Sequence, residues 1–344
     1  MPVLPRPDYR PPPPFRNGHI QTIYPTLFRP LPETSPVRER IQTPDGDFLD
    51  LDWHRAPVRA GRLAVISHGL EGSSRKKYPL GMARHLARLG WDVICLNFRG
   101  CSGEPNLLPR FYHSGVTDDL HTVLTHGLAK GGYGTAALIG FSMGGNQTLK
   151  YLGEAAGKVP REVKAAVTFS VPCDLAGASQ RLARRRNSIY MRYFMRGLRE
   201  KIRVKSLMFP HLLDPAGLSA IRTFVPFDDA YTAPLHGFLD AADYYARCSA
   251  KQFLKDIRVP TLMVQAEDDP FLPPSCYPID EARESHTLWL EIPDYGGHVG
   301  FVKQNGANLY WSEERAGRFL RDVAGGVIKA RNRESFREYQ TGSR

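Results

Sequence analysis

The sequence contains no apolar run that approaches the roughly 18 residues needed to span a bilayer as a helix. Its first residues, MPVLPRPDYRPPPPF, lack the apolar core of a secretory signal peptide. The five cysteines are odd in number and scattered, with no C-x-x-C pair, so neither a disulfide framework nor a zinc site is expected. These absences favour a cytoplasmic protein whose thiols are reduced and mostly buried.

Positive charge is concentrated in one segment instead of being spread along the chain. The net charge is +11, and the segment from Arg181 to Lys205 holds ten basic residues against one acidic residue, Glu200. That segment accounts for +9, which leaves the remainder of the chain at only +2. A nucleic-acid-binding surface is therefore not expected, whereas one local basic patch is.

The order of the predicted elements indicates an α/β fold. Seven prolines in residues 1–14 predict an extended, poorly ordered arm, and residues 15–29 allow no assignment from periodicity. Residues 37–53 predict a hairpin around a Pro-Asp-Gly-Asp turn. Strands and helices then alternate, which predicts a mostly parallel sheet covered by helices on both faces. The strands are expected at 63–67, 91–96, 136–141, 163–170, 260–265 and 287–292, and the helices at 76–89, 117–128, 143–156 and 309–323.

The alternation stops between residues 171 and 255, where no clear strand is recognised. We expect a helical insertion there that forms a cap over the functional site. The predicted organisation is one domain over residues 15–330 that includes this cap, followed by a polar C-terminal tail at 331–344.

The pentapeptide Gly140-Phe141-Ser142-Met143-Gly144 lies between a predicted strand and a predicted helix. Strand, tight turn and helix are the context of a nucleophile elbow, in which the serine is strained and its hydroxyl is exposed above the sheet. The residues two positions either side must lack side chains because the strand and the helix pass too close, and glycine meets that demand. The alternative is a glycine-rich turn whose serine only caps a helix.

A serine hydroxyl needs a base to take its proton and a carboxylate to orient that base. His298 follows the predicted strand 287–292 in a glycine-rich loop and is the expected base. Its rival, His286, precedes the same strand, at the wrong end of the sheet. The expected acid follows the strand 260–265, which gives the order Ser, Asp, His along the chain that this type of sheet requires.

Three aspartates compete for the role of the acid. Asp269 is preferred because it stands four residues before Pro273, as in the common pattern. Asp268 is interpreted as a turn or N-cap residue. Asp294, four residues before His298, is the weaker rival and is interpreted as a turn residue.

An oxyanion hole needs two backbone N–H groups. One is expected from Met143, directly after the nucleophile, and the other from Leu70, in the His-Gly loop that follows the strand 63–67. A second glycine-rich loop, 97–106, lacks both the Lys-Ser/Thr ending of a P-loop and the G-x-G-x-x-G spacing, so no nucleotide site is expected. Arg99 in that loop is expected to brace the loops, and His113 either lines the pocket or belongs to a surface turn.

Together with these residues, several longer motifs carry a resemblance to a known family. They are NGHIQTIYPTLFR, PDGDFLDLDW, HGLEGSS, NFRGCSGEPN, YHSGVTDD, GFSMGGN, DDPF and GGHVGF, and they extend from about residue 15 to beyond residue 301. The chain resembles the YheT-like α/β-hydrolases, also called type 4 of the AB-hydrolase superfamily. The resemblance implies an α/β-hydrolase fold and a Ser-Asp-His hydrolase whose triad falls on Ser142, Asp269 and His298.

The expected function is that of a serine carboxylic-ester hydrolase, or carboxylesterase, which takes a small-molecule ester and needs neither a metal nor an organic cofactor. The resemblance implies short- to medium-chain acyl or lipid-like esters, since some relatives act on phospholipids or transfer acyl groups to alcohols. The alternatives are an acyltransferase with the same triad and a non-catalytic binding protein on a hydrolase scaffold. The serine argues against relatives that use aspartate or cysteine at the elbow.

The basic segment from Arg181 to Lys205 allows two interpretations. It also contains apolar and aromatic residues, so a basic amphipathic cap helix could rest on anionic lipid and admit lipid esters. Alternatively, the helix packs its apolar side on the core and keeps its arginines in water.

Overall fold

An eight-stranded sheet forms the centre of the computed structural model, which describes residues 3–154 and 156–328. The strand order is β1-β2-β4-β3-β5-β6-β7-β8, and only the pairs β1–β2 and β2–β4 are antiparallel. This arrangement confirms the predicted mostly parallel sheet with a hairpin at one edge. The strands are β1 (Val37–Gln42), β2 (Phe48–His54), β3 (Arg62–Ser67), β4 (Trp91–Leu96), β5 (Thr135–Phe141), β6 (Val163–Phe169), β7 (Thr261–Val264) and β8 (Leu288–Glu291).

Helices cover both faces of the sheet, because alternate side chains of each central strand are buried on opposite sides. In β3, Leu63 and Val65 pack in one apolar cluster, whereas Ala64 and Ile66 pack in another. The first cluster includes residues of α3 (Asp118–Ala129) and α4 (Met143–Glu154), and the second includes residues of α2 (Lys77–Arg88) and α11 (Trp311–Ala324). The short helix α10 (Ile279–Glu284) and the turn η5 (Pro274–Cys276) precede β8.

A helix that periodicity did not predict, α1 (Gly18–Phe28), follows the short turn η1 (Pro13–Phe15). Asn17 caps it by accepting hydrogen bonds from the His19 and Ile20 N–H groups. Only Gly18 and Gln21 in this helix are buried, and Pro25 lies inside it. The amphipathic pattern is therefore weak, which explains why periodicity does not indicate a helix here.

The proline-rich segment was expected to be a poorly ordered arm. In the structure, this segment contacts the domain at both Val3 and Tyr9. Val3 forms a parallel bridge with Leu290, and the ring of Tyr9 stacks on Trp311 at 4.9 Å between ring centroids. The predicted polar tail, 331–344, lies outside the described residues.

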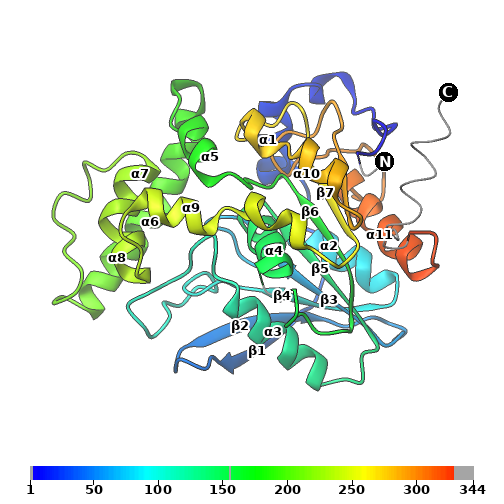
Figure 1. Ribbon diagram of the computed structural model, residues 1–344, viewed down its shortest axis with the longest axis horizontal. Coiled ribbons are helices and arrows are strands. Elements are labelled where there is room, and N and C mark those ends of the chain that lie inside the picture. The colour runs from blue at the N-terminus through cyan, green and yellow to red at the C-terminus, as the bar shows by residue number, and fades with distance from the viewer. Residues whose placement is uncertain (1–2, 155, 329–344) are drawn as a thin grey trace.

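The insertion between β6 and β7 is helical and extends to one side of the sheet (Figure 1). Its last turn, η4, packs against α4. In chain order the insertion comprises α5 (Leu175–Leu182), η2 (Arg185–Asn187), α6 (Ser188–Met208), α7 (Phe224–Phe227), η3 (Asp228–Thr232), α8 (Ala233–His236), α9 (Ala241–Cys248) and η4 (Ala250–Asp256). Over residues 3–154 and 156–328, no helix has the length and apolar character that a membrane crossing requires.

Candidate active site

The turn between β5 and α4 has the backbone geometry of a nucleophile elbow. Ser142 has a positive φ of 52°, a strained value for a residue with a side chain. A Cβ on Gly140 would lie 2.6 Å from the Gly144 carbonyl oxygen, and one on Gly144 would collide with the Ser67 carbonyl oxygen. Both positions therefore require glycine, because neighbouring backbone atoms lie too close for a Cβ, as predicted from the sequence. The Ser142 N–H donates to the Phe169 carbonyl at 2.8 Å, which fixes the turn to β6.

Three predicted residues form one hydrogen-bonded chain. Ser142 Oγ lies 2.8 Å from His298 Nε2, and His298 Nδ1 lies 2.9 Å from Asp269 Oδ2. When Nδ1 donates its proton to the buried carboxylate of Asp269, Nε2 is left to accept the serine proton. The ring of Phe271 stacks on the imidazole at 4.0 Å between centroids, and its N–H donates to Asp269 Oδ1. The arrangement holds a base beside a hydroxyl that has no other means of activation.

The rival candidates for the acid and the base have other contacts or positions. Asp268 Oδ1 accepts the Gly297 N–H at 2.8 Å, and burial raises the pKa of Asp268 to about 6. Asp294 forms an ion pair with Arg6. His286 precedes β8, so it lies at the end of the sheet away from Ser142. Neither aspartate is hydrogen-bonded by its side chain to the side chain of Ser142 or His298 within the described residues.

The two predicted oxyanion donors face the cavity that Ser142 lines. The amides on either side of Leu70 are already used, because Gly69 donates to Tyr78 Oη at 2.8 Å and Glu71 donates to Tyr112 Oη at 3.0 Å. Within the described residues, neither the Leu70 nor the Met143 N–H donates to a backbone acceptor. These two groups are therefore available to a bound oxyanion.

The loop that carries His298 is strained and is held from three sides. Val299 and Phe301 have φ values of 62° and 47°. The Val299 N–H donates to Ser170 Oγ, and Asp268 accepts from Gly297, the residue before the histidine. Such strain persists only where surrounding contacts enforce it.

The third support comes from α1, which sequence reasoning left unassigned. Thr22 Oγ1 accepts the His298 N–H at 2.9 Å, and Gln21 Oε1 accepts the Val302 N–H at 2.8 Å. Gly297 also approaches α1 so closely that a Cβ there would collide with the Gly18 carbonyl. The motif NGHIQTIYP contributes to the family resemblance, but its periodicity does not indicate that this segment contacts the loop of His298.

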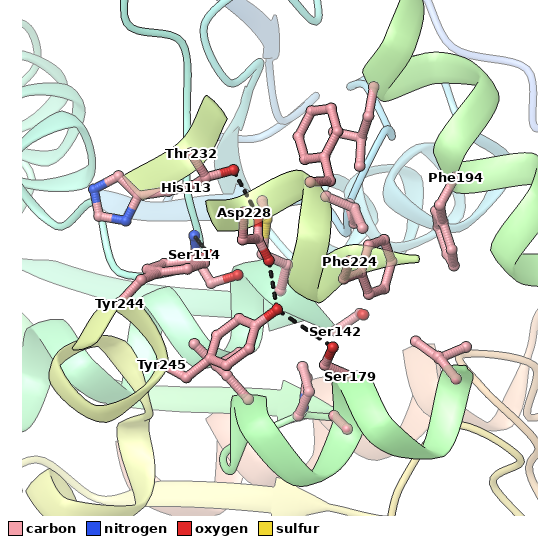
Figure 2. A pocket seen from close by; sticks show the side chains of 18 of the residues that line it. His113, Ser114, Ser142, Ser179, Phe194, Phe224, Asp228, Thr232, Tyr244 and Tyr245 are labelled. Atoms are coloured by element: carbon pink, nitrogen blue, oxygen red, sulfur yellow. Dashed lines mark hydrogen bonds between the residues drawn. The ribbon is translucent and has the colours of Figure 1, made fainter. Parts of the chain in front are cut away.

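Arg99 braces the loops as expected: it forms ion pairs with Asp119 at 2.7 Å, Asp45 at 2.8 Å and Asp47 at 3.1 Å. His113, for which the sequence left two alternatives, lines the cavity beside Ser142 (Figure 2).

The cavity above Ser142 lies between the sheet and the cap. Its lining is predominantly apolar and aromatic, which suits an acyl chain or another apolar group. The cap contributes Leu175, Ala178, Leu182, Phe194, Leu198, Phe224 and Phe227, among others.

Comparisons with known proteins show what the chain is similar to. Residues 65–304 match the family described as alpha/beta hydrolase fold. YheT of Escherichia coli (strain K12), a protein provisionally named an esterase, is 37% identical over 308 residues, which cover 88% of this chain and 89% of YheT. The phospholipase ABHD3 of Homo sapiens is 31% identical over 292 residues, which cover 81% of this chain and 70% of that protein.

Among solved structures, the esterase PF2001 of Pyrococcus furiosus is similar with a TM-score of 0.57 at 17% sequence identity. The match covers 85% of this chain and 92% of that chain, and at this identity it shows a shared fold.

The first prediction concerns the reactivity of Ser142. We expect a fluorophosphonate to phosphonylate Ser142, because the histidine beside it takes the hydroxyl proton. Peptide mass spectrometry identifies the modified residue. Ser142→Ala and His298→Ala should abolish labelling, and Asp269→Asn should slow it at least about a hundredfold. Asp268→Asn is the matched control, and equal slowing in both asparagine variants would contradict the choice of Asp269.

The second prediction concerns Thr22. Thr22→Val removes the acceptor of the His298 N–H without changing the size of the side chain, so the imidazole loses a positional constraint. We expect labelling of Ser142 to slow about tenfold or more. Thr22→Ser keeps the hydroxyl and should restore the rate to within about twofold. If the valine variant labelled at the wild-type rate, α1 would have no positioning role.

Proposed function

The chain belongs to the α/β-hydrolase family, among its YheT-like members, and from this premise we propose that it is a serine carboxylic-ester hydrolase acting through Ser142, His298 and Asp269. The observation that carries the proposal is the continuous hydrogen-bonded chain from Asp269 through His298 to the Ser142 hydroxyl, at the floor of an apolar cavity. The esterase and phospholipase names of the relatives support the same class of reaction.

In the first half of the reaction, Ser142 Oγ attacks the acyl carbonyl carbon while His298 Nε2 takes the hydroxyl proton. Asp269 accepts a hydrogen bond from Nδ1 and stabilises the imidazolium that forms. The N–H groups of Leu70 and Met143 donate to the tetrahedral oxyanion. When the intermediate collapses, the bond to the alcohol oxygen breaks, and the alcohol leaves with the proton from Nε2.

The second half repeats these steps with water as the nucleophile. His298 takes a proton from the water, whose oxygen attacks the acyl carbon. The intermediate then releases Ser142 Oγ, which regains the proton from Nε2, and the carboxylic acid departs. Neither half requires a metal ion or an organic cofactor.

The lining of the cavity supports short- to medium-chain acyl or lipid-like esters as substrates. Its apolar and aromatic cap residues fit an apolar chain. The acyltransferase alternative differs only in the second half, where an alcohol replaces water. The ratio of ester formed to acid released in added ethanol distinguishes the two.

The cap also offers a surface that fits anionic lipid. The exposed side chains of Ile189, Arg192, Tyr193 and Arg196 follow a helical spacing along one face of α6. Arg184, Arg185 and Arg186, also exposed, directly precede this helix. Basic and apolar side chains on one face are typical of helices that rest on anionic membranes. We propose peripheral contact with such a surface, next to Phe194, which lines the cavity.

The third prediction concerns acyl length. For p-nitrophenyl esters from acetate to palmitate, we expect kcat/KM to peak at short or medium chains, because the cavity has a limited volume. Ser142→Ala should lower kcat at least about 10⁴-fold at every length. Hydrolysis that survived in this variant would contradict the proposed nucleophile.

The fourth prediction concerns lipid contact. Arg184→Glu, Arg185→Glu and Arg186→Glu together should greatly weaken co-sedimentation with phosphatidylserine-containing vesicles, since each basic residue contributes about 1 kcal/mol near an anionic surface. Charge reversal of the exposed Lys255, Arg318 and Arg321 is the matched control. Equal binding by both triple variants, or equal binding to pure phosphatidylcholine, would rule out this surface.

A further inference from the structure

The cap wall of the cavity contains a buried carboxylate that the hydrolytic steps do not use. Asp228 begins η3, a π-helical turn between α7 and α8, and lines the same cavity as Ser142. Thr232 donates to its Oδ1 at 2.6 Å and Tyr245 donates to its Oδ2 at 2.5 Å, as Figure 2 shows. Both donors are neutral hydroxyls. Each carboxylate oxygen has a second lone pair and so retains the capacity to accept another hydrogen bond.

Asp228 differs from the other buried carboxylates of the described residues, because it alone forms no ion pair. Eight others are buried, and each lies beside an arginine or a histidine. These pairs are Asp47–Arg99, Asp50–Arg40, Asp52–Arg38, Asp92–Arg55, Asp119–Arg99, Asp269–His298, Glu291–Arg315 and Glu313–Arg29.

A buried carboxylate without a cation is costly, so proteins normally pair it or shift its pKa. Burial, with a smaller contribution from the nearby charge of Asp229, raises the pKa of Asp228 to about 6. Asp228 is therefore mostly ionised at neutral pH. Among the described residues that line the cavity there is no lysine or arginine. Burial also holds the pKa of His113 well below its usual range, so this histidine supplies no positive charge.

Aromatic side chains surround the space that Asp228 faces. Phe224, Phe227, Tyr244 and Tyr245 all line the cavity. Aromatic faces attract cations, most strongly where water is excluded. A carboxylate among aromatic rings favours an ammonium group and disfavours an anionic one. The π-helical turn also favours a functional role, because π-helical turns are rare in proteins and those that occur often lie at functional sites.

We propose that the ester hydrolysed at Ser142 carries an ammonium group that binds Asp228 within the cavity. The proposal rests on the hydrolase function proposed above and adds a substrate class to it. Asp228 supplies the charge, Tyr245 and Thr232 orient its carboxylate, and the aromatic rings enclose the cation. The missing partner of the buried carboxylate is thus the substrate.

The test compares cationic esters with neutral esters of the same shape. One pair has the cation in the acyl half: p-nitrophenyl 6-(trimethylammonio)hexanoate against p-nitrophenyl 7,7-dimethyloctanoate. The other has it in the alcohol half: hexanoylcholine against 3,3-dimethylbutyl hexanoate. Hydrolysis is followed in a pH-stat at pH 7.5. We expect kcat/KM for the cationic member of at least one pair to exceed that of its neutral partner about tenfold or more.

Asp228→Asn should reduce that ratio to near one, because it removes the charge that binds only the cationic ester. Asp229→Asn is the matched control, since Asp229 bonds the Ala241 N–H and does not line the cavity. A ratio near one in wild type for both pairs, or equal ratios in wild type and Asp228→Asn, overturns the proposal. So does an equal loss in Asp229→Asn. Failure to hydrolyse any ester, neutral ones included, would instead count against the hydrolase function.

The pH dependence of the ratio of kcat/KM for the cationic and neutral esters distinguishes an effect of the Asp228 charge from an effect of altered structure. Any effect of pH that is common to both esters cancels in the ratio. As pH falls through about 6, Asp228 becomes protonated, so the cationic preference should disappear. Tyr245→Phe removes a donor to the carboxylate and should shift this loss to higher pH. A ratio that does not change between pH 5 and 8 overturns the role of Asp228.

Discussion

The close approach of two backbone segments at Gly144 and Ser67 is the constraint on which the candidate site depends. No Cβ fits between them, so α4 starts directly against the end of β3. This contact brings the loop after β3 beside the elbow, where Gly69 lies so near that its Cβ would be 3.2 Å from that of Ser142. One steric requirement therefore places Ser142 and both candidate oxyanion donors around the same space.

The sheet and the hydrogen-bonded triad could be predicted because their signals are local. The sequence alone shows apolar strands bounded by glycine-rich loops, and it shows polar residues directly after the strand ends. Helix α1 could not be predicted, since it buries only Gly18 and Gln21 and contains Pro25. Asp228 gave no signal either. Its distinguishing property is the lack of a cation among its neighbours, which arises only when the cap folds over the sheet.

The basic residues of the segment from Arg181 to Lys205 have different environments in the folded protein. Lys201 pairs with Glu71 at 3.1 Å, and Lys205, which is buried, donates to the carbonyls of Asn106 and Leu108. Desolvation lowers the pKa of Lys205 to about 8. Arg199 donates to the Ile221 carbonyl. The two lysines thus fasten the cap to the loops of the sheet, and Arg199 forms a contact within the cap. The exposed arginines of the run are Arg184, Arg185, Arg186, Arg192, Arg196 and Arg203. The net charge of the segment therefore overestimates the positive charge that is exposed on the surface.

The loop of His298 joins parts of the chain that are synthesised at very different times. Thr22 holds its backbone, and Ser142 lies 156 residues before the histidine. At about 5–20 residues per second, a ribosome that has completed the elbow needs roughly 8 to 30 seconds more to add the base. During that interval Ser142 lacks the histidine that contacts its hydroxyl, and α1 lacks the loop that it contacts. Under the proposed mechanism, Ser142 therefore has no base until translation has passed residue 298.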